Sequence, residues 1–593
     1  MASPVTTRTV RPLDTLRFDT SGPPEIMKAV ADRLRRLGAE AADHAPGDSP
    51  TGHTLLTGGD FQPAEAHTTW SGPGTGIGDE ATVQAATGIM AVHGRRDGAP
   101  RGLAADYSAT ATAVLTVQGM LAGLLAQARG AAAPTRLTTR ADHAGLLSVS
   151  QYLAAAGADE GEAAEIAPGG PPFTSADGVL FELETLDPGA WAGFWRALDA
   201  PADAIRSGWR PFQFRYATAC APFPHVLHTT TQAHALERIR RAASASGAEV
   251  CVLGTLADRA AEHDGAAPWS LDLLRPTGPG NGAPAPTPAR PLAGLTVLEA
   301  GRRIQAPLAA HLLGLLGAEV IRIEPPGGDP LRGMPPACSG ISARWLALNR
   351  GKQAVEIDIK SPGDRRRLRE MAAEADVFLH NWAPGKAAEL GLDADDLAEV
   401  NPALVHAYTS GWGDRLPDAP MGTDFMVQAR TGVGEAVRPE GEPPAPSLMT
   451  LLDVLGGLIG TEAVLAGLLL RERTGHGVRV DSSLLGAADT LTAPALARAV
   501  RGENPRKPSG FRRPLPTADG WIAPSDDCAT AAAAYDLRNL STDEALRQCR
   551  AHGLTATPVT TDLSGLHDDP RFAGSISRDT HGVLSVPDPW SFA

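Results

Sequence analysis

The chain has 593 residues, too many for one hydrophobic core, so two or more domains are expected. A hydrophobic content of 43% and a charged content of 20% are typical of a globular protein, and the net charge of -15 argues against a nucleic-acid-binding protein. The five cysteines and the histidines show no metal-ligand spacing, which argues against a zinc site or a disulfide scaffold. We recognise neither a signal-peptide core nor an uncharged apolar run of about 18 residues, so we expect a cytoplasmic protein with no membrane segment.

Short sequence matches divide the chain into two unequal tandem copies. EATVQAATGIM at 80–90 is echoed by DFMVQARTGVG at 424–434, and MLAGLLAQARG at 120–130 is echoed by VLAGLLLRERTG at 464–475; both pairs are separated by 344 positions. A Pro- and Gly-rich stretch between the copies is typical of an extended linker. The resulting division is a flexible tail at 1–12, a degenerate first copy at 13–275, a linker at 276–290 and a complete second copy at 291–593.

The second copy opens with alternating strand and helix signals. LTVLEAG at 295–301 predicts a buried strand, 306–317 has apolar residues at helical spacing and ends on a glycine, and AEVIRIE at 318–324 predicts another strand. Segments 353–359, 376–381 and 403–411 continue the alternation. This pattern predicts an α/β fold with an open, doubly wound parallel sheet. The first copy is expected to lack the opening strand–helix–strand segment, and no GxGxxG fingerprint supports a dinucleotide site.

Several motifs of the second copy resemble the class III CoA-transferases, the CaiB/BaiF family, which includes formyl-CoA transferases and α-methylacyl-CoA racemases. The motifs are VLEAGRRIQAPLAAHLLGLLGAEVIRIEPP, LNRGKQAVEIDIK, ADVFLHNWAPGKAAELGL and LLDVLGGLIGTEAVLAGLLLRERTGHG. The resemblance implies a large doubly wound domain, a smaller second domain and two interlinked subunits. A tandem chain would then be a covalent pseudo-dimer, either monomeric or assembled into a homodimer.

The resemblance implies that Asp453 is the catalytic nucleophile. In the transferase branch this carboxylate carries the acyl group through an anhydride and an aspartyl-CoA thioester, which conserves the thioester energy. Asp453 begins a predicted helix over 454–471, whose N-terminus favours an ionised carboxylate. Gly456 and Gly457 let a thioester or a second backbone approach closely. The alternative from the residues alone is that Asp453 is only a helix N-cap.

Six further residues are candidates for binding acyl-CoA. Arg302 and Arg303 follow the first strand of the second copy, where open α/β sheets bind ligands. The resemblance adds Ile304 and Gln305 near the thioester, and Lys352 and Asn381 as CoA contacts. It implies acyl-CoA and a small carboxylic acid as substrates, with no permanently bound cofactor and no metal.

Other functions stay open from the sequence. Thr423 occupies the position of the racemase histidine, which counts against an α-methylacyl-CoA racemase or isomerase because threonine is no general base near neutral pH. Asp424 beside it is expected to be a supporting carboxylate. A non-catalytic or repurposed CoA-thioester-binding protein is a further alternative. In the first copy Ala109 stands at the position of Asp453, so a single site is expected unless a three-residue slip makes Asp106 its equivalent.

Overall fold

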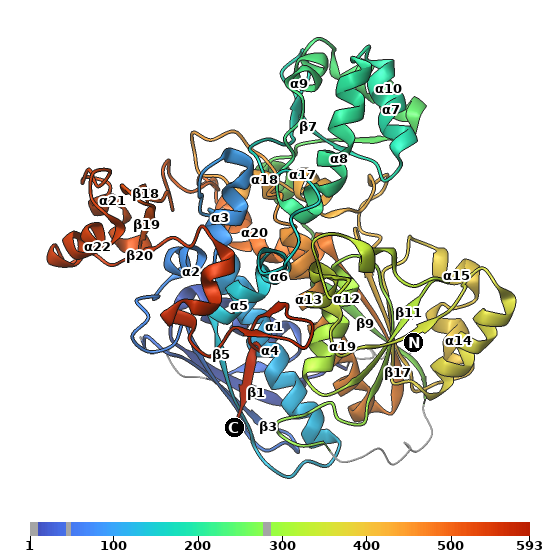
Figure 1. Ribbon diagram of the computed structural model, residues 1–593. Coiled ribbons are helices and arrows are strands. Elements are labelled where there is room, and N and C mark those ends of the chain that lie inside the picture. The colour runs from blue at the N-terminus through green and yellow to red at the C-terminus, as the bar shows by residue number, and fades with distance from the viewer. Residues whose placement is uncertain (1–9, 43–48, 277–285) are drawn as a thin grey trace.

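The computed structural model describes residues 10–42, 49–276 and 286–593 and shows two sheet-and-helix halves side by side (Figure 1). Most of the predicted tail and most of the predicted linker lie outside these described residues. The last strand before the linker ends at Pro276, and the next sheet strand begins at Thr296.

The second half contains the predicted doubly wound sheet. Its seven strands run in the order β14-β11-β10-β15-β16-β17-β9, and all neighbours are parallel except β17 and β9. The bounds are β10 Thr296–Ala300, β11 Glu319–Glu324, β14 Gln353–Glu356, β15 Val377–His380, β16 Val405–Ser410, β17 His476–Ser483 and β9 Trp269–Pro276. The strand order reverses between β10 and β15, which is where such sheets bind ligands.

Helices cover both faces of this sheet because its parallel crossovers require them. One face packs against α12 (Gln305–Leu315) and α19 (Leu451–Thr474) in the large central core. The other face carries α14 (Pro362–Glu374) and α16 (Ala394–Ala398), which contribute to a separate apolar cluster.

The first half holds a reduced copy of the same sheet. Its order is β2-β1-β3-β4-β5-β23, with bounds β1 Leu16–Ser21, β2 Glu40–Ala41, β3 Gly52–Gly58, β4 Ala64–Thr69, β5 Thr135–Arg140 and β23 Trp590–Phe592. The expectation that this copy lacks an opening strand–helix–strand segment is wrong: β1, α1 (Pro24–Arg36) and β2 form one, with parallel strands. The repeated LGAE at 37–40 and 316–319 was the signal for it. The antiparallel pair β3–β4 follows, and the described residues between β2 and β4 include no covering helix.

Each half donates one strand to the sheet of the other. β9, from the end of the first copy, pairs antiparallel with β17. β23, from the end of the second copy, pairs antiparallel with β5, the counterpart of β17. This reciprocal exchange interlinks the two copies, as the pseudo-dimer prediction requires.

Each copy also has a smaller three-stranded domain that packs on the other copy (Figure 1). The strands are β6 Phe173–Thr174, β7 Leu180–Glu184 and β8 Glu249–Val252 in the first copy, and β18 Leu515–Pro516, β19 Trp521–Pro524 and β20 Ala556–Pro558 in the second. β7 and β8 contact α17 (Asp424–Arg430), whereas β19 and β20 contact α2 (Glu80–Ala86). The first small domain is the larger because α7 (Pro188–Ala197), α8 (Ala202–Thr218) and α9 (His225–Gln232) lie between its second and third strands.

Two long apolar helices, α4 (Tyr107–Ala128) and α19, pack against each other between the sheets. The expectation that no long uncharged run exists is wrong, since α4 has no charged residue in its 22 positions. Both helices are long and apolar enough to cross a membrane, but their apolar windows are 100% buried inside the protein. Their composition therefore fits core helices that are covered on all sides.

Candidate functional site

Asp453 lies on the wall of a cavity rather than at a helix cap. Helix α19 begins at Leu451, with Thr450 preceding it in a left-handed conformation at φ 55°, so the N-cap alternative is wrong. The side chain of Asp453 is partly buried and lines a cavity of about 460 Å³. A carboxylate in this position can meet a ligand without unpacking the helix.

Asp424 holds the turn of the helix that carries Asp453. Its Oδ2 accepts the backbone N–H of Asp453 at 2.7 Å, and its Oδ1 accepts the side-chain amide of Gln428. Asp424 is only 1% exposed. Asp424 thus binds the backbone of the helix turn that carries Asp453.

The two carboxylates repel each other in a buried setting. Burial raises the pKa of Asp424 to about 6, and it raises the pKa of Asp453 well above its ordinary value, with the charge of Asp424 adding to the rise. Arg303 acts in the opposite direction on the pKa of Asp453. The helix N-terminus therefore does not keep Asp453 in the ordinary aspartate range, contrary to the sequence-based argument.

Arg302, Arg303 and Asn381 meet at the point where the strand order reverses. Asn381 accepts the backbone N–H of Arg302 at 2.8 Å and donates to its carbonyl oxygen at 2.9 Å. Arg303 adopts a left-handed backbone at φ 64°, and its guanidinium lies 5.3 Å from the ring centre of Tyr216. Asn381 thus clamps the loop that presents both exposed arginines.

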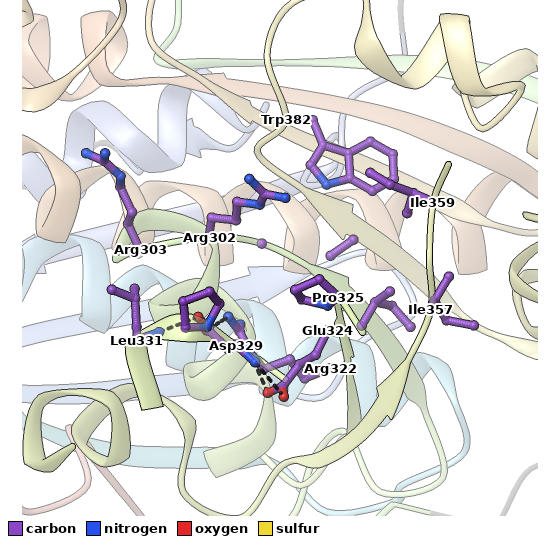
Figure 2. A pocket seen from close by; sticks show the side chains of 14 residues that line it. Arg302, Arg303, Arg322, Glu324, Pro325, Asp329, Leu331, Ile357, Ile359 and Trp382 are labelled. Atoms are coloured by element: carbon purple, nitrogen blue, oxygen red, sulfur yellow. Dashed lines mark hydrogen bonds and ion pairs between the residues drawn. The ribbon is translucent and has the colours of Figure 1, made fainter. Parts of the chain in front are cut away.

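A second cleft continues from this loop along the carboxyl edge of the sheet (Figure 2). It has a volume of about 260 Å³ and an apolar wall that includes Ile357, Ile359 and Trp382. Figure 2 shows Arg302 and Arg303 extending away from the ion pair of Arg322 with Asp329.

The cleft and the cavity beside Asp453 have three lining residues in common, and these are Arg303, Pro330 and Leu331. The two spaces therefore adjoin, so an elongated ligand can reach from the sheet edge to the carboxylate.

Lys352 does not reach this cleft. Its Nζ donates to Glu299 at 3.0 Å, to the Pro307 carbonyl at 2.8 Å and to Asn349 at 2.8 Å, and its side chain is 3% exposed. Burial lowers its pKa to about 8. All three donors are satisfied inside the protein, so contact with a CoA phosphate would require the pair with Glu299 to open.

Gln305 begins α12 and points a free amide toward α19. It is 5% exposed, and its Nε2 is a buried donor that forms no hydrogen bond with the described residues. A Cβ on Gly456 would lie 2.9 Å from this Nε2, and one on Gly457 would lie 2.9 Å from the Gln305 carbonyl oxygen. A second backbone thus approaches closely at Gly457, whereas the approach of a thioester to these glycines stays a prediction. Ile304, just before Gln305, lines the cavity.

The first copy completes the site with residues that no sequence motif indicated. Helix α8 lines the cavity with Gln213, Phe214, Tyr216 and Ala217. Glu184 of β7 accepts a hydrogen bond from Thr423 at 2.9 Å, accepts another from the Tyr216 hydroxyl, and pairs with the buried guanidinium of Arg215 at 3.0 Å. Thr423 thus docks the small domain of the first copy.

The equivalent position of the first copy has lost its carboxylate. Glu80 accepts the backbone N–H of Ala109 at 2.7 Å and the amide of Gln84 at 2.8 Å, which repeats the arrangement of Asp424, Asp453 and Gln428. Asp106 precedes α4 and is ion-paired with Arg512 at 2.6 Å. The alternative alignment of the two copies, shifted by three residues so that Asp106 would match Asp453, is therefore wrong.

Comparisons with known proteins cover both halves. The family model described as CoA-transferase family III matches residues 74–284 and 292–572. Succinyl-CoA:glutarate CoA-transferase of Mus musculus is 34% identical over 238 residues, 40% of this chain and 53% of that protein. Acetyl-CoA:oxalate CoA-transferase of Acetobacter aceti is 34% identical over 247 residues, 40% of this chain and 62% of that protein. The chain spans little more than half the length of these curated relatives.

Among solved structures, the crystal structure of a CAIB/BAIF family protein from Brucella suis is 26% identical. It covers 50% of this chain and 91% of that chain, with a TM-score of 0.46.

Proposed function

Because the chain belongs to CoA-transferase family III, we propose that it is a CoA-transferase that moves CoA from an acyl-CoA to a carboxylic acid through Asp453. The observation that carries the proposal is the position of this carboxylate on the wall of a cavity that adjoins a cleft at the ligand-binding edge of the sheet. The proposed site lies in the second half, under the small domain of the first.

The cleft suits the nucleotide end and arm of CoA. Its apolar side chains can pack against an adenine and a pantetheine chain, while Arg302 and Arg303 supply exposed positive charge for phosphate groups. The clamp by Asn381 holds the loop in place before the ligand binds. The thioester of such a ligand would then lie in the cavity beside Asp453.

The proposed relay has four steps. Asp453 attacks the thioester carbonyl, the carbon–sulfur bond breaks, and CoA leaves as a thiolate with an aspartyl–acyl anhydride remaining. The thiolate attacks the aspartyl carbonyl, which releases the donor acid and forms an aspartyl-CoA thioester. The acceptor carboxylate displaces the thiolate to give a second anhydride, and the thiolate attacks its acceptor carbonyl, which yields the new acyl-CoA and frees Asp453.

Two groups are suited to stabilise negative charge in these steps. The unpaired Nε2 of Gln305 is a buried donor on α12 that faces Gly456, about one turn after Asp453 on α19, and such a donor stabilises an oxyanion when the geometry is fixed beforehand. Arg303 lines the cavity and lowers the pKa of Asp453. Arg303 thus favours the ionised nucleophile, and both groups are suited to stabilise the tetrahedral intermediates.

The cavity favours acids with an apolar body. Its lining includes Phe214, Met334, Trp345 and Leu348. Arg344 in the same wall is already paired with Glu162 at 2.6 Å, whereas Arg303 stacks on Tyr216 and faces the cavity. We therefore propose that the acceptor is an acid with a single carboxylate, which reacts at Asp453 and pairs with Arg303, and that the rest of the acid is hydrophobic.

Trapping of the covalent intermediate tests the proposal. The enzyme is incubated briefly with a panel of acyl-CoAs and hydroxylamine, and peptide masses are measured. We expect a hydroxamate on Asp453, and no hydroxamate in Asp453→Asn. Asp106→Asn, at the start of the equivalent helix of the first copy, serves as the matched control and is expected to behave as wild type. A hydroxamate elsewhere, or none with any donor, would contradict the relay.

A racemase or isomerase is the second candidate, because a carboxylate with a raised pKa is suited to abstracting a proton beside a thioester. Thr423 supplies no partner base, and its hydroxyl is bound to Glu184. Incubation with 2-methylacyl-CoA in deuterated water separates the two functions: α-deuteration without an acceptor acid indicates the isomerase, and acceptor-dependent exchange of CoA indicates the transferase.

A further inference from the structure

The outer face of the first sheet carries two histidines and a glutamate from the β3–β4 pair. His53 and His67 are direct partners in the antiparallel register, and Glu65 lies two residues before His67, so all three side chains share one face. In the described part of the first copy no helix corresponds to α14 or α16, and the three side chains are 31–51% exposed.

We propose that His53, Glu65 and His67 form a binding site for a divalent transition-metal ion of the zinc type. The Nε2 of His53 lies 2.9 Å from Oε1 of Glu65, and the Nε2 of His67 lies 3.3 Å from the same oxygen. The three prospective ligand atoms all lie within 4.8 Å of one another. Tetrahedral zinc with ligands at about 2.0–2.1 Å needs ligand atoms roughly 3.3 Å apart, so small rotations of the side chains suffice.

The chemistry of the three ligands selects the kind of ion. Two imidazoles and one carboxylate suit zinc and its neighbours in the first transition series, and they are poor ligands for magnesium or calcium, which prefer oxygen. Water can complete the coordination because the face is exposed. Arg136 lies 3.7 Å from Oε2 of Glu65 and leaves Oε1 for the metal.

The sheet also fixes the geometry in advance. The histidines stand on paired strands, with ring centres 5.1 Å apart, so little conformational freedom is lost when they bind an ion. Sequence spacing gave no hint of the site, because 12 positions separate His53 from Glu65 and the register of the strand pair brings them together. The expectation of no metal rested on that spacing and on the family resemblance, and neither takes the strand register into account. The site is remote in sequence from the proposed CoA site and independent of it.

Zinc titration of the full-length protein tests the site. After chelator treatment and desalting, we expect one zinc ion per chain with a dissociation constant in the micromolar range or below, measured by competition with a chromophoric chelator. Cobalt should give the intense visible absorption of a four-coordinate ion. His67→Ala and His53→Ala should each weaken binding at least tenfold, whereas His552→Ala, an exposed histidine of the other half, should not. Unchanged binding in His67→Ala, or no binding at 100 μM zinc, would overturn the proposal.

Discussion

The backbone N–H of Ala109 donates to Glu80 over 2.7 Å, the same distance at which the N–H of Asp453 donates to Asp424. The two copies therefore retain the same supporting carboxylate, the same helix start and the same amide partner, Gln84 or Gln428. They differ at the position that would carry the acyl group. The first copy therefore keeps the hydrogen bonds around this helix turn but has alanine in place of the carboxylate of Asp453.

The small domain that packs over the equivalent region of the first copy is also reduced. The small domain of the second copy, which packs on α2, has no counterpart of α8 among the described residues, and α8 is the helix that lines the cavity beside Asp453. Arg512 is buried there instead, bound to Asp106, Asp526 and two backbone carbonyls of the first copy. Of the two small domains, the one that belongs to the first copy is larger, and its helix α8 covers the cavity beside Asp453 of the second copy.

Restoring the carboxylate of the first copy should not restore a second site. Ala109→Asp would place a second buried carboxylate beside Glu80, and we expect it to destabilise the fold by about 2–4 kcal/mol. In hydroxylamine trapping with a competent acyl-CoA, the variant should still give one modified aspartate per chain. Ala109→Ser is the control for changing the volume without adding charge. Two modified aspartates would contradict this account of the first copy.

The sequence predicted the fold well where helices and strands alternate with strong apolar periodicity, as in β10, α12 and β11. It missed the short β1–α1–β2 unit because Glu40 and Ala41 form a two-residue strand with exposed side chains and leave no apolar pattern. Within the site, the resemblance indicated Asp453 and Asp424 by position. Glu184 was missed because it lies 239 residues before Thr423, and only the interlinked topology brings it there together with its partner Tyr216.

The pH dependence of turnover should reveal the raised pKa of the nucleophile. Because burial and Asp424 favour the protonated form of Asp453, nucleophilic activity should fall with decreasing pH well above the ordinary aspartate pKa of about 3.9. Asp424→Asn removes the neighbouring charge and should shift this acid limb of kcat/KM to lower pH. An acid limb at the same pH in wild type and variant would show that the two carboxylates do not interact.

The same shift makes Asp453 a cost to stability at neutral pH. A folded-state pKa above the unfolded value means that stability falls as pH rises from the unfolded pKa to the folded pKa. At pH 8 the free energy of unfolding of Asp453→Asn should therefore exceed that of wild type by about 1 kcal/mol, so the variant should unfold at a higher temperature while losing turnover. The difference should shrink as the pH is lowered toward 4. Equal melting temperatures at both pH values would argue that Asp453 is well solvated.

Lys352 should matter to folding more than to CoA affinity. Lys352→Met leaves buried Glu299 with Arg322 as its remaining cation, and we expect a loss of about 2–3 kcal/mol in urea unfolding. The KM for acyl-CoA should change less than threefold in the folded variant. Arg302→Met, which removes an exposed charge at the cleft, should instead raise KM with little change in stability. A large rise in KM with little loss of stability in Lys352→Met would instead indicate that Lys352 binds a CoA phosphate.

The buried ion pair between Arg33 and Glu462 should hold the two copies together. Arg33 on α1 of the first copy contacts both oxygens of Glu462 on α19 of the second, at 2.9 and 2.8 Å, and their side chains are 5% and 1% exposed. The indole N–H of Trp269 donates to the same carboxylate at 2.9 Å. Glu462→Gln leaves the guanidinium buried without a counter-charge, so we expect a loss of about 2–4 kcal/mol in urea unfolding.

A second variant on α1 and a double variant separate the pair from the helix itself. Asp32→Asn breaks the exposed pair with Arg35, whose side chains are 69% and 54% exposed, and should change stability by less than about 0.5 kcal/mol. Arg33→Leu combined with Glu462→Gln removes the buried, unpaired guanidinium and keeps a hydrogen-bond acceptor for Trp269. The double variant should therefore recover at least half of the stability lost in Glu462→Gln. If Glu462→Gln were as mild as Asp32→Asn, the ion pair would not contribute measurably to the interface between the copies, and the exchanged strands and the apolar packing of α4 against α19 would suffice to hold it.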